Sequence, residues 1–167
     1  MKKLLIPITA LLLLACISCE KKIDVDKEKA AIMAVIQSES EFARDGNVEG
    51  LKSLYLQDEY NTRLSIGNES YKILTGWDKV GPNLDQALEN TETEFSATIT
   101  KASPIIKVYE ETAWIICDNT WEGIYEGGDF IMNNIQVSFL EKVEGEWKIS
   151  FISFIDKPKP EDVEEIE

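Results

Sequence analysis

The chain has 167 residues and a formal net charge of −14, because 31 acidic side chains outnumber 17 basic ones, and it contains no histidine. This length allows one domain with a hydrophobic core, and such an acidic surface repels phosphate backbones, so we expect no nucleic-acid partner. The absence of histidine excludes Ser-His-Asp and Cys-His catalysis as well as histidine-ligated zinc and haem, and we expect neither a metal nor a cofactor.

The N-terminus has the pattern of an export signal. Two lysines precede an apolar run, Leu4 to Leu14, that is too short to span a bilayer. The segment Leu13-Leu14-Ala15-Cys16 resembles the lipobox of bacterial lipoproteins, in which cleavage before the cysteine is coupled to lipid attachment on its sulfur. Lipidation at Cys19 and secretion without a lipid are the alternatives. The sequence therefore predicts a signal peptide over 1–15 and a lipid-anchored protein of the bacterial cell envelope, outside the cytoplasm.

The first predicted element of the domain is a helix that starts at Ala30, after a charged tether over residues 16–29. Asp26 can cap this helix, and apolar residues at helical spacing form one stripe along it. Glu39 falls inside that stripe. A carboxylate on the core side of a helix needs a cavity or a partner, although a rolled helix would let Glu39 reach solvent.

Two more helices and a short hairpin complete the N-terminal half. A second helix is predicted over Val48 to Leu56. A strand over Tyr60 to Ile66 then turns at Gly67-Asn68 into another over Tyr71 to Leu74. A third helix opens at Gly76, after this hairpin.

Beyond the third helix the hydrophobic period changes from helical to two, which predicts strands. They are Phe95 to Lys101, Ile105 to Glu110, Thr112 to Tyr125, Phe130 to Val143 and Trp147 to Ile155. Cys117 lies in an apolar run, so we expect a buried structural thiol. The predicted domain covers 30–156, and residues 157–167 form an acidic tail.

This order of elements predicts an α+β fold in which a curved antiparallel sheet wraps around three N-terminal helices. Three segments carry a family resemblance: Gly46-Asn47-x-x-Gly50-Leu51-x-x-Leu54-Tyr55, Gly76-x-x-x-Val80, and the final Gly-Glu-Trp-Lys-Ile. With them the chain resembles the nuclear transport factor 2-like (NTF2-like) superfamily, which includes SnoaL-like cyclases and ketosteroid isomerase. The resemblance covers about Lys29 to Ile155 and implies a cone whose mouth lies between the sheet and the helices.

The resemblance to ketosteroid isomerase can be tested on its catalytic groups, which are a carboxylate base, a tyrosine and a protonated aspartate. Aligned on this chain, they fall near Arg63, at Glu39 and near Ile135, respectively. All three residues have the wrong chemistry, so we expect no isomerisation by that mechanism. We hypothesise instead that Glu39 and Arg63 form an ion pair across the cavity, or that Arg63 receives a ligand carboxylate. An exposed Arg63 is the alternative.

Side-chain alternation along the later strands suggests which residues face the cavity. From Phe130 to Leu140 the odd positions are mostly apolar, namely Ile131, Ile135, Val137 and Phe139, and Asn133 interrupts them. If this odd face packs on the helices, Asn133 points into the cavity and the mixed even face lies outside. That even face would then be available for a homodimer.

The preceding strand, Thr112 to Tyr125, follows the same logic. Its odd positions place Asn119 and Trp121 toward the mouth of the cavity. A β-bulge would instead turn Asp118 and Thr120 inward. The sequence leaves both arrangements open.

The leading interpretation is an envelope lipoprotein whose cone binds a small apolar or amphipathic ligand, or serves as an accessory module, without catalysis. The candidate pocket residues are Glu39, Tyr55, Tyr60, Arg63, Trp77, Asn119, Trp121 and Asn133. One alternative is a SnoaL-like or isomerase-like enzyme that uses Glu39 or Asp118 as acid or base. The other is an interaction module that docks partners through its outer sheet face.

Overall fold

The computed structural model describes residues 23–89, 95–125 and 127–158. The predicted signal peptide, both lipidation candidates, Cys16 and Cys19, and residues 159–167 of the predicted tail lie outside this range. In the part of the chain that is described, no helix combines the length and apolar character needed to cross a membrane.

The N-terminal half of the described chain contains three helices, α2 (Val25–Arg44), α3 (Val48–Ser53) and α4 (Trp77–Glu89), and a β-hairpin lies between α3 and α4. Helix α2 begins before the predicted Ala30 because Asp24, and not Asp26, is its N-cap and accepts a hydrogen bond from the Lys27 amide at 3.2 Å. The described end of the predicted tether is therefore helical.

Helix α3 is shorter than predicted, because the chain joins the sheet soon after Ser53. The Leu56 amide donates to the Ile149 carbonyl at 2.9 Å, and the Ile149 amide donates to the Leu54 carbonyl at 2.8 Å. Tyr55 lies between these two bonds in a parallel bridge with Ile149. This bridge fixes Tyr55 beside the sheet, with its side chain buried.

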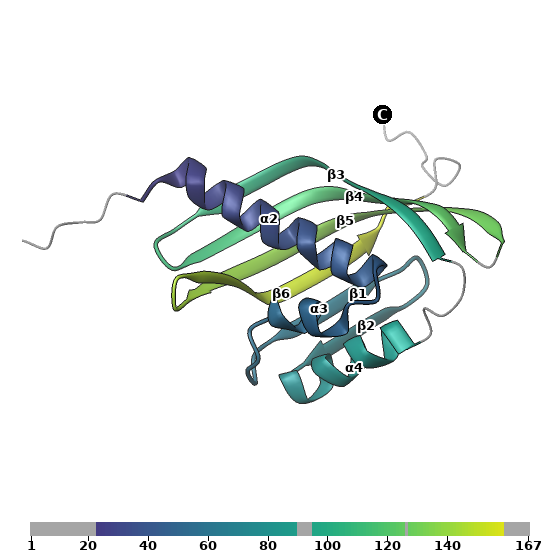
Figure 1. The fold of residues 1–167 in the computed structure, drawn as a ribbon, viewed down its shortest axis with the longest axis horizontal. Coiled ribbons are helices and arrows are strands. Elements are labelled where there is room, and N and C mark those ends of the chain that lie inside the picture. The colour runs from purple at the N-terminus through teal and green to yellow at the C-terminus, as the bar shows by residue number, and fades with distance from the viewer. Residues whose placement is uncertain (1–22, 90–94, 126, 159–167) are drawn as a thin grey trace, which may run out of the picture.

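The strands form one curved sheet in the order β2-β1-β6-β5-β4-β3. Their bounds are β1 Thr62–Ile66, β2 Tyr71–Thr75, β3 Phe95–Val108, β4 Thr112–Tyr125, β5 Gly128–Val143 and β6 Glu146–Asp156. The predicted β1–β2 hairpin is confirmed. Strand β1 pairs with β6 in parallel, so the sheet is mixed and not wholly antiparallel as predicted. Figure 1 shows α2 across the concave face, with α3 and α4 beside the β1–β2 end.

Strand β3 runs through the gap that the sequence predicts between two separate strands. Ser103 has a positive φ of 49°, and the pairing of β3 with β4 shifts register between Ala102 and Ile105. Pro104 within this stretch has no amide hydrogen to donate to the ladder. The proline therefore marks an irregularity within one strand.

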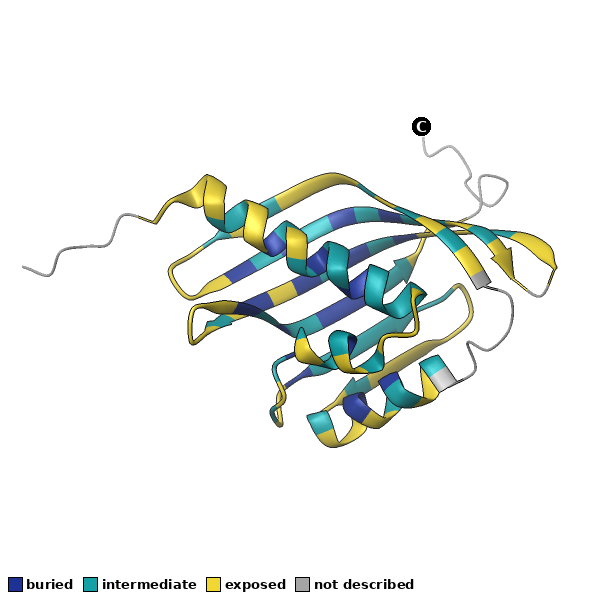
Figure 2. Cartoon of the chain, in the orientation of Figure 1, coloured by how far each residue is buried: buried dark blue, intermediate teal, exposed yellow. Residues whose placement is uncertain are grey.

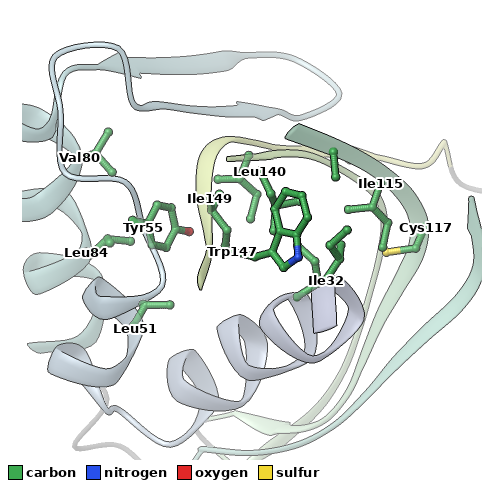
Figure 3. Close-up of a cluster of buried hydrophobic side chains, with 13 residues drawn as sticks. Ile32, Leu51, Tyr55, Val80, Leu84, Ile115, Cys117, Leu140, Trp147 and Ile149 are labelled. Carbon is green, nitrogen blue, oxygen red and sulfur yellow. The ribbon is translucent and has the colours of Figure 1, made fainter. Parts of the chain in front are cut away.

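The hydrophobic core lies between α2 and the sheet and continues under α3 and α4 (Figure 3). Its buried members are Ile32, Ile36, Leu51, Tyr55, Val80, Leu84, Ala113, Ile115, Cys117, Leu140, Trp147, Ile149 and Ile152. Figure 2 shows the matching pattern on α2, whose sheet-facing residues are buried while outward-facing ones are exposed. The prediction of a buried Cys117 thiol is confirmed, and it forms no disulfide with any residue that the structure describes. Burial raises the pKa of this thiol.

The predicted orientation of β5 is wrong. Its even positions Asn134, Gln136, Ser138 and Leu140 are buried, whereas Asn133, Ile131 and Phe139 are exposed on the outer face. The prediction assumed that the more apolar face must cover the helices. Here the inner face is polar because it borders a cavity, and the surface predicted for a homodimer therefore lies inside the cone.

The start of α2 is tied to the far end of the sheet by one carboxylate. Glu28 accepts hydrogen bonds from Lys142 Nζ at 2.6 Å and from Trp147 Nε1 at 2.7 Å. These two bonds, first that of Lys142, hold the pKa of Glu28 below its ordinary value. The carboxylate therefore stabilises the fold in its charged form, and this stabilisation is lost as the pH falls through the lowered pKa.

We expect Glu28→Gln to lower the free energy of unfolding by about 1–2 kcal/mol at pH 7, because one charge-assisted bond and one ion pair weaken. Denaturant unfolding should be measured from pH 7 to pH 3. The difference in free energy of unfolding between wild type and variant should shrink below about pH 4.5, where the unfolded-state carboxyl protonates. The matched control is Glu146→Gln. The Glu146 carboxylate is exposed beside Lys148, so this variant should have the same free energy of unfolding as wild type. A difference that stays constant down to pH 3 would contradict this account.

Candidate functional site

A cavity of about 340 Å³ lies between the C-terminal part of α2, strand β1 and the long strands. It is lined by Glu39, Ala43, Arg63, Ser65, Ile66, Gly67, Asn119, Trp121, Met132, Asn134, Phe154 and Asp156. This volume is at the lower end of the range for small-molecule sites. The cavity thus has a few polar groups set among apolar and aromatic walls.

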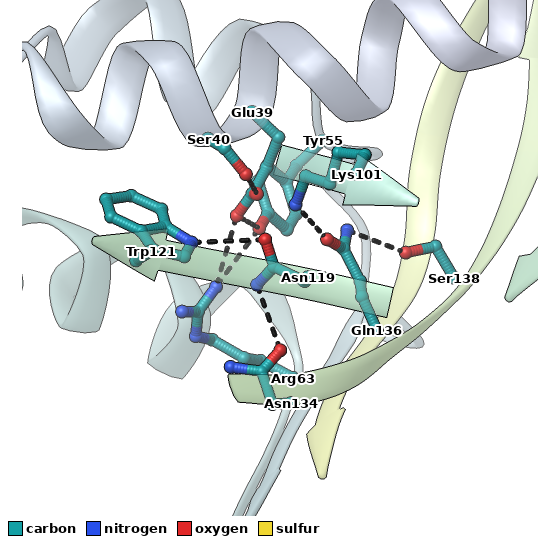
Figure 4. Close-up of polar contacts among 10 residues, drawn as sticks. All are labelled: Glu39, Ser40, Tyr55, Arg63, Lys101, Asn119, Trp121, Asn134, Gln136 and Ser138. Atoms are coloured by element: carbon teal, nitrogen blue, oxygen red, sulfur yellow. Dashed lines mark hydrogen bonds and ion pairs between the residues drawn. The ribbon is translucent and has the colours of Figure 1, made fainter. Parts of the chain in front are cut away.

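Glu39 is the centre of the polar groups (Figure 4). Its side chain is only 4% exposed, and its oxygens accept hydrogen bonds from Tyr55 Oη at 3.3 Å and from Ser40 Oγ at 3.2 Å. Arg63 Nη1 lies 3.8 Å from Glu39 Oε1 and donates to Tyr55 Oη at 3.1 Å. The predicted ion pair therefore forms, whereas the alternatives of a solvent-facing Glu39 and an exposed Arg63 are wrong.

The surroundings of Tyr55 keep its phenol protonated. Burial, and next the neighbouring Glu39 carboxylate, raise the pKa of Tyr55 far above its ordinary value. Tyr55 therefore donates to Glu39 while accepting from Arg63. Arg63 is also packed against Phe154, with its guanidinium carbon 5.0 Å from the ring centroid. These contacts hold the guanidinium at one place on the cavity wall.

A second polar group crosses from β4 to β5. Trp121 Nε1 donates to Asn119 Oδ1 at 3.1 Å, and Asn119 Nδ2 donates to Asn134 Oδ1 at 2.9 Å. Asn119 and Asn134 are paired directly across the two strands, and both are buried. Of the predicted residues, the structure thus brings Glu39, Tyr55, Arg63, Asn119 and Trp121 together around the cavity.

Lys101 of β3 is a partly buried cation that sequence reasoning missed. It donates to Gln136 Oε1, and Gln136 Nε2 donates to Ser138 Oγ at 3.3 Å. Burial lowers the pKa of Lys101, and the nearby Glu39 charge partly opposes this shift. The inverted orientation predicted for β5 hid Asn134, Gln136 and Ser138. The sequence did contain one indication of Lys101: in a strand whose side chains alternate between the two faces, it occupies an inward-facing position.

Other predicted site residues lie away from the cavity. Tyr60 is 75% exposed. The Trp77 ring packs beside Tyr55, with centroids 6.3 Å apart, and does not line the cavity. Asn133 is on the outer face, where it accepts a hydrogen bond from Thr120 Oγ1 at 2.9 Å. Asn133 was misplaced because the orientation of β5 was inferred from the composition of its two faces.

Asp118, the second carboxylate proposed as an acid or base, also faces away from the cavity. Its side chain is 40% exposed and pairs with Lys157 Nζ at 2.6 Å. Its neighbour Asn119 points inward, so the bulge that would swap them is not present between β4 and β5. Asp118 is therefore a surface ion-pair residue.

The fold of this chain is similar to that of several solved structures. No protein-family model matches the sequence, and no curated protein matches it. An NTF2-like superfamily protein from Salmonella enterica matches with a TM-score of 0.66 and 15% identity, over 81% of this chain and 95% of that chain. A candidate dehydratase of the NTF2-like family from Streptomyces avermitilis matches with a TM-score of 0.67 and 14% identity, over 80% and 99%.

A third match is an NTF2-like protein of unknown function from Shewanella oneidensis. It has a TM-score of 0.61 and 16% identity, over 77% of this chain and 99% of that chain. At such identities the similarity shows the fold and carries no activity from one protein to the other. The chain therefore has the NTF2-like fold, with helices followed by a curved, open, mixed sheet.

Proposed function

We propose that the protein is a non-catalytic, small-ligand-binding module of the cell envelope. The observation that supports this function is the cavity beside α2, whose polar groups Glu39, Arg63, Asn119 and Asn134 converge among apolar walls. Concave sites of this composition are the usual place for a small ligand. The polar groups would fix the orientation of the ligand, and the walls would bury its apolar part.

The enzymatic alternative has less support from the site. Both oxygens of Glu39 are engaged, one by Tyr55 and Arg63 and the other by Ser40. Asp118, the other candidate, faces away from the cavity. The contacts of Glu39 with Tyr55, Arg63 and Ser40 therefore favour a role in holding these side chains in place.

Filling the cavity tests the binding function. Ala43 lines the cavity from α2, whereas Ala34 is exposed on the same helix. We expect a fragment library, screened by ligand-observed NMR against the wild-type protein, to yield compounds that bind Ala34→Phe unchanged and lose at least tenfold in affinity for Ala43→Phe. Equal binding to both variants, or no binding compound at all, would contradict the proposal.

The proposal includes a lipid anchor on Cys16, with Cys19 as the alternative residue. It rests on the lipobox-like segment, and it would hold the cone near the membrane surface through a charged segment. Globomycin, which blocks lipoprotein signal cleavage, should cause the larger precursor to accumulate. Cys16→Ser should release the protein from membranes, and release by Cys19→Ser alone would assign the lipid to Cys19.

A homodimer through the outer sheet face is part of the same proposal. The support is the row of exposed apolar side chains there, including Ile131 at 66% and Phe139 at 48% exposure, with the Phe139 ring 5.7 Å from that of Phe151. Light scattering on the mature domain should give a dimer that Phe139→Glu converts to a monomer. A wild-type protein that stays monomeric across concentrations would rule this out.

A further inference from the structure

The hydrogen-bond chain from β4 to β5 has a fixed direction. The indole of Trp121 can only donate, so the Asn119 amide must turn its oxygen toward Trp121. The Asn119 nitrogen then points to Asn134 and donates to Asn134 Oδ1 at 2.9 Å. This arrangement forces the amide nitrogen of Asn134 to the other side, and the chain ends on a hydrogen-bond donor.

That terminal donor lies on the cavity wall. Asn134 is 2% exposed and lines the cavity, and its Nδ2 donates to no residue that the structure describes. Because Asn134 lines the cavity, these N–H groups are available to an acceptor inside it. The group marks a place where an acceptor atom of a ligand would be bound.

Arg63 presents a second set of donors to the same cavity. Its contacts with Glu39 and Tyr55 both use Nη1, and Phe154 lies against its face. In the described part of the chain, Nε and Nη2 of Arg63 therefore donate to no acceptor. A guanidinium has five N–H groups in a planar fork that suits a carboxylate, so most of this capacity remains unused.

Few charged side chains line the cavity. Glu39 is the buried carboxylate there, and Nη1 of Arg63 lies 3.8 Å from its Oε1. A second carboxylate, Asp156, lines the cavity from an exposed position where solvent screens it. At the inner end the charge of Arg63 is therefore balanced by Glu39, and what remains available to a ligand is the set of unused N–H donors of Arg63 and Asn134.

We propose that the ligand is a small organic carboxylate that enters with its carboxylate group innermost, between Arg63 and Asn134. This inference rests on the proposed binding function and names its ligand class. Glu39 is a positioning residue, because it holds Tyr55 and Nη1 of Arg63 and leaves the rest of the guanidinium for the ligand.

The walls define the rest of the ligand. Trp121, Phe154, Met132 and Ile66 line the cavity and offer aromatic and aliphatic surface to a flat, apolar body. A volume of about 340 Å³ corresponds to roughly eleven water molecules at about 30 Å³ each. A single aromatic ring with a short acid side chain has suitable dimensions, and trans-cinnamate is a convenient probe.

The test compares trans-cinnamate with its uncharged isostere trans-cinnamamide by isothermal titration calorimetry at pH 7.5. The informative variant is Asn134→Asp, which keeps the acceptor for Asn119 but replaces the unpartnered donor by a negatively charged oxygen. The matched control is Asn133→Asp, which makes the same chemical change at the adjacent residue, on the outer face. Circular dichroism confirms that each variant is folded.

We expect wild type and Asn133→Asp to bind cinnamate at least tenfold more tightly than cinnamamide, and Asn134→Asp to lose this preference. Arg63→Lys keeps the positive charge but removes the forked guanidinium. It should weaken the binding of cinnamate about tenfold and change the affinity for cinnamamide little. Equal binding of both probes, unaffected by Asn134→Asp, would overturn the carboxylate inference and leave the binding function standing. Binding of neither probe, together with an empty fragment screen, would overturn both.

Discussion

Arg63→Ala is expected to lower the free energy of unfolding by about 3 kcal/mol, because it leaves the Glu39 carboxylate buried without its contacting cation. Tyr55 also loses a donor, and Lys101 remains bound to Gln136. Urea unfolding monitored by tryptophan fluorescence gives the measurement. We expect a lower urea concentration at the midpoint of unfolding and an unchanged dependence of the free energy of unfolding on urea concentration.

The control for this prediction is Arg44→Ala, which removes an exposed arginine paired with its neighbour Asp45. Exposed ion pairs add little to stability, so this variant should unfold like wild type. The double variant Arg63→Ala with Glu39→Gln should recover part of the loss, because the uncompensated charge is then gone. A single Arg63→Ala variant as stable as wild type would show that Glu39 does not depend on this pair.

Ile36→Ala is expected to lower the free energy of unfolding by about 3 kcal/mol, because the Ile36 side chain on α2 is fully buried against the sheet. The matched control is Ile131→Ala, which removes the same atoms from a side chain that is 66% exposed on the outer face. For an isolated protomer, the free energy of unfolding of this control should stay within about 0.5 kcal/mol of the wild-type value. Similar losses in both variants would contradict the placement of α2 on the concave face.

Much of the fold could be predicted because the chain signals it locally. The switch from helical to two-residue periodicity located the four long strands to within a few residues, apart from the division of β3. Glycine and asparagine at 67–68 located the hairpin between β1 and β2. These signals depend on neighbouring residues alone, so they can be read without knowledge of the tertiary structure.

The orientation of β5 could not be predicted in the same way. A strand beside a cavity presents polar residues inward, so the more apolar face, with Ile131 and Phe139, is the outer one. The pairing of β1 with β6 joins segments far apart in sequence and has no local signal. Because of the inverted face, Asn134 and Gln136 were missed as cavity residues while Asn133 was wrongly included.

Glu39 was identified from the sequence because a carboxylate inside an apolar stripe requires an explanation. The structure supplies partners for it in Ser40, Tyr55 and Arg63. These partners come from α2, from the segment after α3 and from β1, so only the tertiary fold could bring them together. Their arrangement makes Glu39 an anchor for the groups that would hold a ligand.

The most direct test of the account is a crystal structure of the mature domain soaked with trans-cinnamate. We predict density for the probe in the cavity beside α2, with its carboxylate within hydrogen-bonding distance of Arg63 and Asn134 and its ring against Phe154 or Trp121. A probe bound with its ring innermost and its carboxylate in solvent, or found only on the outer sheet face, would contradict the central claim.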